Sequence, residues 1–124
     1  MARSLLEFTG TVVELEKELI PKLRKARIVS EDSSMIVEMD LHEDLVVYEK
    51  GRRLKIGIFD GVPDYRDGID LVMSAYHVSK RETGEREEHL FSAGGLLFKI
   101  SLPKNVLNVA PLQKVYIKVE EKQE

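Results

Sequence analysis

Apolar and polar residues alternate with a period of two along several short stretches of this chain. The pattern is clearest in residues 35–41, 54–59, 96–102 and 115–120. Successive side chains of a β-strand point to opposite faces of the sheet, so each stretch offers one apolar face to a core and one mostly polar face to solvent. We therefore expect antiparallel strands with these core-facing residues: Met35, Val37, Met39, Leu41, Leu54, Ile56, Ile58, Leu96, Phe98, Ile100, Leu102, Val115, Ile117 and Val119.

Turn-forming residues separate the alternating stretches. They occupy residues 30–34, 49–51, 61–68, 82–85 and 103–105. Gly, Pro, Asn, Asp and Ser are the residues that tight turns use, so these segments read as connections between strands. Short strands at such spacing predict an all-β fold, either a barrel or a sandwich, and closure into a barrel would remove exposed strand edges.

The first third of the chain fits two different elements. A helical stripe would contain Val12, Leu15, Leu19 and Leu23. A strand is favoured over residues 5–15, because the β-branched Thr and Val residues there lose rotamer freedom in a helix. We expect a strand over residues 5–15, a turn or short helix over 16–22, and a second strand over 24–31.

Composition points to one folded domain spanning residues 1–124, with 43% apolar and 33% charged residues. The net charge of -3 does not favour binding to a phosphate backbone. The chain has no cysteine, which excludes disulfides, thiolate nucleophiles and cysteine-ligated metals. No stretch approaches the roughly 20 apolar residues of a membrane span, and no signal peptide is evident, so we expect a cytoplasmic protein without a membrane partner.

Candidate chemistry is sparse. His42, His77 and His89 have no metal-ligand spacing, and we interpret all three as surface or turn residues. The loop of residues 60–70 contains four aspartates, Asp60, Asp64, Asp67 and Asp70, whose spacing differs from the calcium-binding pattern. We predict a solvated loop, no catalytic residue, no metal and no cofactor, with a metal-dependent enzyme at this loop as a third hypothesis.

A binding site for single-stranded nucleic acid is the alternative hypothesis. Small β-barrels grip single strands with aromatic side chains in a basic groove. Arg52, Arg53 and Lys55 follow closely after Tyr48, which would have to face outward to stack on a base. Aromatic residues make up only 6% of the chain, so a protein-interaction module is favoured over autonomous nucleic-acid binding.

Gly94 and Gly95 form the only adjacent glycine pair. They precede a strand rather than a helix, which argues against a phosphate-binding loop. Glycine in a strand costs backbone entropy, so the pair is expected to serve a bulge, a positive φ angle or a close backbone approach at a barrel corner.

The run Ser92-Ala93-Gly94-Gly95-Leu96-Leu97-Phe98-Lys99-Ile100 resembles the Ser-x-Gly-Gly-Leu-Leu strand of the eighth-subunit family of RNA polymerases, which includes the archaeal G-type member. Other stretches agree with that family in order and spacing: residues 27–32, 35–41, 45–48, 55–58, 71–78 and 115–119. The loop of residues 61–70 is shorter than in eukaryotic members, which indicates the archaeal branch. Ser74 and Ala75 replace a Tyr and a Gly of the family pattern.

The resemblance implies a single antiparallel barrel of about eight strands, related to the oligonucleotide-binding fold. It also implies an accessory subunit that docks on the largest subunit within the polymerase assembly, away from the catalytic magnesium. The assembled polymerase transfers nucleotides, whereas this chain would supply none of the chemistry and would contact nucleic acid only indirectly or weakly. Gly94, Gly95 and Leu97 are the candidate partner-interface residues.

Overall fold

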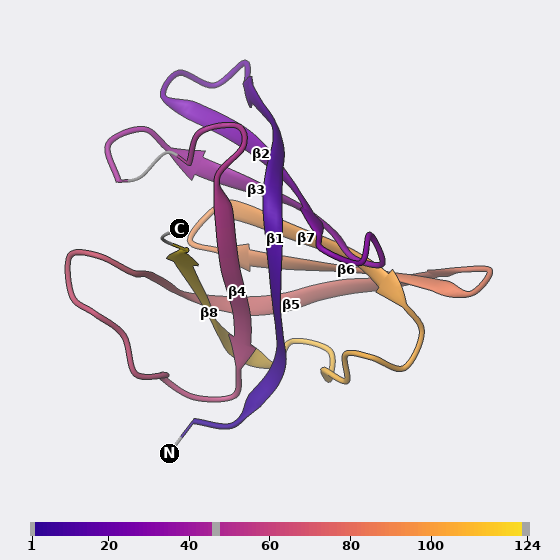
Figure 1. The fold of residues 1–124 in the computed structure, drawn as a ribbon. Coiled ribbons are helices and arrows are strands. Elements are labelled where there is room, and N and C mark those ends of the chain that lie inside the picture. Colours follow the sequence, from indigo (N-terminus) through magenta and orange to yellow (C-terminus); the bar gives the residue numbers. More distant parts are fainter. Residues whose placement is uncertain (1, 46–47, 123–124) are drawn as a thin grey trace.

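Each of the four alternating stretches forms a strand in the computed structural model, which describes residues 2–45 and 48–122. The described strands are β1 (Ser4–Lys17), β2 (Leu23–Ser30), β3 (Ile36–His42), β4 (Arg53–Phe59), β5 (Leu71–Thr83), β6 (Arg86–Ala93), β7 (Leu96–Pro103) and β8 (Lys114–Glu121). They close into a barrel in the order β1-β2-β3-β7-β6-β5-β8-β4 (Figure 1). All pairings are antiparallel, so the predicted all-β barrel is confirmed.

The first third of the chain forms strands, and the helical alternative is wrong. β1 extends slightly beyond the predicted 5–15 at both ends, and a turn without a helix leads into β2. β1 pairs with β2 on one side and with β4 on the other, so its backbone groups are satisfied by neighbouring strands. Leu19, which the helical stripe would have placed beside Val12, is fully exposed in the turn, whereas Val12 is buried.

The core lies inside the barrel and is built from alternate residues of the strands. Nearly all of the expected core-facing residues are buried; Met35 and Leu96 are partly buried. Each Leu or Ile removed from water in this way contributes roughly 1.5–3 kcal/mol. Because the period of two decides which face is apolar, the sequence pattern is enough to orient these strands.

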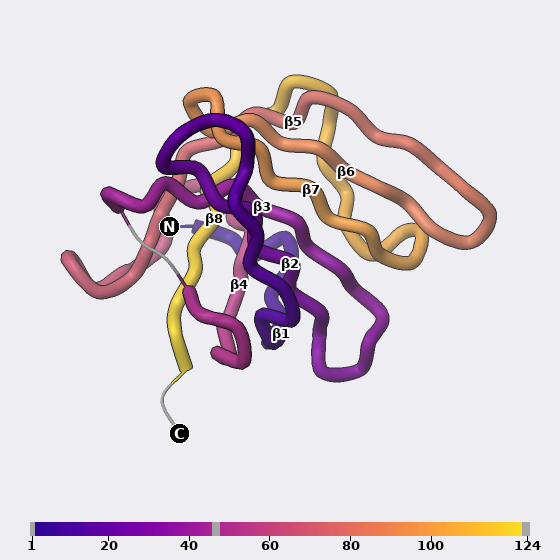
Figure 2. Tube along the Cα trace, turned by 90° about the horizontal axis from the view of Figure 1, so that it is seen from above, coloured from indigo at the N-terminus to yellow at the C-terminus, as the bar shows by residue number. Residues whose placement is uncertain are grey.

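The hairpin of β5 and β6 projects from the barrel, as both Figure 1 and Figure 2 show. β5 is long because it has two neighbours in succession: its first residues pair with β8 and its later residues pair with β6. Within the described ranges, no helix is long and apolar enough to cross a membrane.

Candidate interaction groove and other predicted sites

Two strand ends face each other without a strand between them. β3 pairs with β7 only from Ile36 to Met39, although β3 continues to His42. β5 begins at Leu71, but its pairing with β6 begins only at Tyr76. In the described part of the chain, residues 40–42 and 71–75 therefore have a strand neighbour on one side alone, β2 and β8 respectively. Such edges carry backbone N–H and C=O groups that can pair with another chain.

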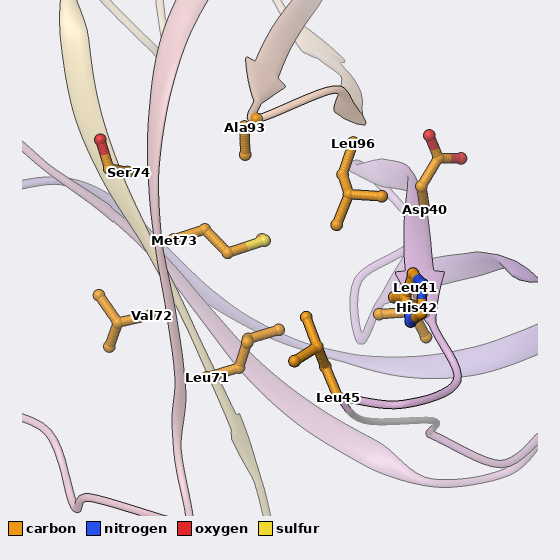
Figure 3. Close-up of a pocket in the computed structure, with 11 residues that line it drawn as sticks. Asp40, Leu41, His42, Leu45, Leu71, Val72, Met73, Ser74, Ala93 and Leu96 are labelled. Carbon is orange, nitrogen blue, oxygen red and sulfur yellow. The ribbon is translucent and has the colours of Figure 1, made fainter. Parts of the chain in front are cut away.

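An apolar groove of about 460 Å³ separates these two edges. We call it the β3–β5 groove; it is lined by Asp40, Leu41, His42, Leu45, Leu71, Val72, Met73, Ser74, Ala93, Gly94 and Leu96. Figure 3 shows the side chains of Met73, Leu71, Leu45 and Leu96 pointing into the same space, while Val72 and Ser74 point away from it. The arrangement offers an apolar floor between two hydrogen-bonding edges.

Gly94 and Gly95 form the two-residue turn between β6 and β7 at the rim of this groove, since Ala93 pairs with Leu96. Their φ angles are 58° and 94°, the left-handed conformation that a two-residue hairpin of this type requires at both positions. A Cβ atom at either position would meet nothing within 4 Å. The predicted positive φ is therefore confirmed, whereas the expected bulge or close approach within the barrel is wrong.

Leu97 and Asp40 lie together beside this turn. Leu97 is 46% exposed on the outer face, and its backbone N–H donates to Asp40 Oδ2 at 2.9 Å. Asp40 itself is buried. The three predicted interface residues Gly94, Gly95 and Leu97 thus share one end of the β6–β7 hairpin, and Gly94 lines the groove directly.

The alternative nucleic-acid site does not form a stacking surface. Tyr48, which this hypothesis required to face outward, is only 3% exposed and belongs to the core, where burial raises its pKa to about 12. Arg52 pairs with Glu121 at 3.4 Å, Lys55 pairs with Glu7 at 3.7 Å, and Arg53 contacts Glu31. The outward orientation of Tyr48 is a wrong prediction; its side chain is needed to fill the barrel.

The aspartates of residues 60–70 are not gathered into one site. Asp60 accepts the backbone N–H of Arg3 at 2.7 Å. The Asp70 side chain is 1% exposed and lies 2.9 Å from Arg66, whose hydrogen bond keeps the pKa of Asp70 below its ordinary value. Throughout the described ranges, no three His, Cys, Asp or Glu side chains are placed to hold a metal ion.

The prediction that the three histidines are surface or turn residues is wrong for His77 and His89. His77 and His89 are 2% and 1% exposed, and Glu87 beside them is 2% exposed. His89 Nδ1 lies 3.0 Å from His77 Nε2, and His89 Nε2 lies 3.0 Å from Glu87 Oε2. The signal was available: Glu87, His89 and the buried Phe91 follow one another at intervals of two, which puts them on one face of a strand.

Comparison with known proteins gives one family. A family model that describes the G-type subunit of DNA-directed RNA polymerase matches residues 5–122. No curated protein matches the chain. Among solved structures, the cytoplasmic molybdate-binding protein ModG with molybdate bound aligns over 93% of this chain and 89% of its own, at 12% identity and a TM-score of 0.39, which is too distant to inform function. The family match covers nearly the whole barrel, and the chain belongs to the RpbG family of DNA-directed RNA polymerase subunits.

Proposed function

We propose that this chain is an accessory, non-catalytic subunit of an archaeal-type RNA polymerase and that it docks on the largest subunit through the β3–β5 groove. The observation that carries the proposal is the apolar groove between two strand edges that, among the described residues, have no strand neighbour on the side facing the groove. Membership of the family indicates that the partner is another subunit of the RNA polymerase, and the groove offers a surface suited to a polypeptide.

The groove suits an extended segment of the partner better than a helix. Strands in a sheet lie about 4.7–4.9 Å apart, and a free edge presents its N–H and C=O groups at the spacing of a partner strand. A segment pairing with residues 40–42 or 71–75 would place every second side chain over Met73 and Leu96. The Gly94–Gly95 turn has no side chain, so it leaves the rim open to a partner backbone.

The remaining polar side chains support an accessory role rather than a chemical one. Asp70 is engaged by Arg66, Asp60 by Arg3, and the buried Glu87 by His89. Groups that are already paired within the fold are poorly placed to bind a substrate or a metal ion.

The proposal is tested by two matched substitutions of exposed leucines. Leu45 lies in the groove and is 70% exposed, whereas Leu19 lies in the turn after β1 and is 104% exposed. Neither side chain is needed for the core, so Leu45→Glu and Leu19→Glu should both fold. We expect Leu45→Glu to weaken binding to the purified largest subunit by about tenfold or more, because a carboxylate would be desolvated against apolar side chains.

The Leu19→Glu variant should bind like the unaltered chain. Binding can be measured by titrating the fluorescently labelled barrel with the largest subunit and following anisotropy. Equal affinities for the two variants would remove the groove from the interface. Absence of any binding by the unaltered chain would remove the largest subunit as the partner.

The mode of docking has its own readout. Hydrogen exchange of the barrel in complex with the largest subunit should slow at backbone amides of residues 40–42 or 71–75 if a strand is added. Slowing elsewhere, with binding intact, would show that the barrel docks through another face.

A further inference from the structure

Three buried side chains connect the β5–β6 hairpin to the loop of residues 104–113 between β7 and β8. His77 Nδ1 lies 3.2 Å from the carbonyl oxygen of Ala110, and His77 Nε2 lies 3.0 Å from His89 Nδ1. His89 Nε2 in turn lies 3.0 Å from Glu87 Oε2. We call this chain of contacts the histidine relay. It plays no part in the proposed docking groove.

The relay holds the loop at two places. At one end, Glu87 Oε1 accepts the backbone N–H of Asn105 at 3.4 Å. At the other end, His77 reaches the carbonyl of Ala110. The backbone of His77 adds two bonds near the exit of the loop, accepting the N–H of Leu112 at 2.9 Å and donating to the carbonyl of Gln113 at 3.0 Å. Leu107, between the two anchors, is 2% exposed and belongs to the core.

The geometry fixes the number of protons that the relay needs. A carbonyl oxygen only accepts, so His77 Nδ1 must carry a proton. One proton is needed between the two imidazoles, and one between His89 and Glu87, which makes three in all. Two neutral imidazoles and one carboxylate bring only two. The relay is therefore saturated only when it holds one extra proton, and its formal charge is then zero.

Any other proton count breaks a contact. With one proton fewer, two lone pairs face each other in one of the three contacts. With one proton more, two donors face each other. Because all three side chains are buried, neither conflict can be relieved by water without opening the loop.

We propose that the histidine relay is a proton-operated latch on the loop of residues 104–113. The latch is closed when the relay holds three protons and is weakened by the gain or the loss of one. Its loop then loses its anchors at Asn105 and Ala110 while the strands of the barrel stay paired.

The groups around the relay set where the extra proton resides. Burial lowers the pKa of His77, which disfavours a second proton on this ring, so the extra proton lies in the contact between His89 Nε2 and Glu87 Oε2. Although burial opposes it, hydrogen bonds from His89, the Asn105 amide and Lys80 keep the pKa of Glu87 below its ordinary value. Lys80 Nζ, 3.4 Å from Glu87 Oε1 and partly exposed, is the charged group that connects the relay to solvent. The ring of Phe91, which does not titrate, lies against both imidazoles, with ring centroids 5.1 Å from His77 and 6.5 Å from His89.

The sign of the acid response follows from His77. A histidine whose pKa is lowered by folding contributes stability above its ordinary value of 6.5 and loses it as the pH falls. Below the lowered pKa of His77, a fourth proton is driven onto the relay. When the extra proton is withdrawn at alkaline pH, two lone pairs face each other in one of the three contacts, and the relay holds the loop less strongly.

The experiment is hydrogen exchange of the unaltered chain between pH 5 and pH 10, with protection factors corrected for intrinsic exchange rates. Protection of the amides of Asn105 and Leu112 should pass through a maximum and fall about tenfold on either side, the equilibrium change expected for one lost hydrogen bond. Protection in β1 and β2 should stay level over the same range. A loop whose protection tracks that of β1 and β2 at every pH would overturn the latch.

A pair of variants adds an independent arm. His89→Phe removes both relay bonds of that ring at similar size, whereas His42→Phe alters a partly exposed histidine outside the relay. We expect His89→Phe to abolish the maximum in loop protection and His42→Phe to keep it. A maximum that survives His89→Phe would also overturn the proposal. If His89→Phe does not fold, the pH series on the unaltered chain still decides.

Discussion

The carboxylate of Asp40 provides the hydrogen-bond partner for the backbone of Leu97: Oδ2 accepts the N–H at 2.9 Å. In the register of β3 and β7, Met39 lies opposite Phe98, so Asp40 and Leu97 would be the next pair. The ladder stops there, and the side chain of Asp40 holds the start of β7 in its place. This bond fixes one wall of the β3–β5 groove, while beyond Met39 the edge of β3 that faces the groove has no strand neighbour in the described part of the chain.

Replacing Asp40 tests this bond. Asp40→Ala should lower the free energy of unfolding by about 1–3 kcal/mol, because the partly buried Leu97 amide loses its acceptor. Asp40→Asn keeps an acceptor oxygen and should retain most of the stability. Urea denaturation followed by circular dichroism measures both, with Asp64→Ala in the exposed loop as the control. Equal losses for Asp40→Ala and Asp40→Asn would show that charge, rather than the bond to Leu97, is what matters.

The Gly94–Gly95 turn makes a prediction about backbone strain. Gly95 has a φ of 94°, so Gly95→Ala should destabilise the barrel by roughly 1–2 kcal/mol although a Cβ would meet nothing. Gly61 has no positive φ, and a Cβ there would make ordinary contact with Ala2 at 3.7 Å. Gly61→Ala should therefore leave the melting temperature nearly unchanged. A Gly95→Ala variant that melts with the unaltered chain would contradict the strain argument.

The lowered pKa of Asp32, in the turn between β2 and β3, predicts that part of the stability of the protein is lost at acidic pH. Hydrogen bonds from Ser34 and Ser30 lower its pKa from 3.8 to about 2. A carboxyl whose pKa is lowered by folding stabilises the protein at a pH above its ordinary pKa. That contribution is lost as the pH falls toward the pKa of the folded state. The difference in free energy of unfolding between the unaltered chain and Asp32→Ala should thus be constant above about pH 5 and shrink between pH 3.8 and about pH 2.

Urea unfolding at a series of pH values measures this difference. Asp67→Ala, in the exposed loop before β5, is the control and should show no comparable trend. A difference that persists unchanged at pH 2 would mean that Asp32 acts through something other than its charge.

Nucleic-acid binding by the free barrel should be weak. Arg52 and Lys55 are already paired with carboxylates, Arg53 contacts Glu31, and Tyr48 is buried. We expect low-affinity binding of single-stranded oligonucleotides that fades as salt rises, because only screened surface charge contributes. Fluorescence anisotropy at increasing salt provides the measurement. Tight binding that resists salt would favour the alternative function.

Local patterns were sufficient for the four strands with clear alternation and for the side of each that faces the core. Alternation at a period of two follows from the geometry of a single strand, so Leu54, Ile56 and Ile58 could be oriented without knowing their neighbours. Turn residues also act locally, and the lack of a Cβ permits the positive φ of Gly95. The resemblance of residues 92–100 to a polymerase family, together with weaker matches in the same order along the chain, led to the correct family, because order and spacing are properties of the sequence.

The candidate site and the buried polar groups depended on the tertiary structure. The β3–β5 groove exists because β3 and β5 extend past the ends of their pairings with β7 and β6, and the extent of a pairing is set by partners far away in sequence. Tyr48 follows a turn and has no alternating neighbours to reveal its burial. His77 and His89 are tolerated inside the barrel only because Glu87 and the Ala110 carbonyl meet them there. The sequence by itself determined the strands with alternating residues and the apolar side chains of those strands that face inward. The closure of the barrel decided which edges stay open and which polar groups find partners, since both depend on contacts between distant segments.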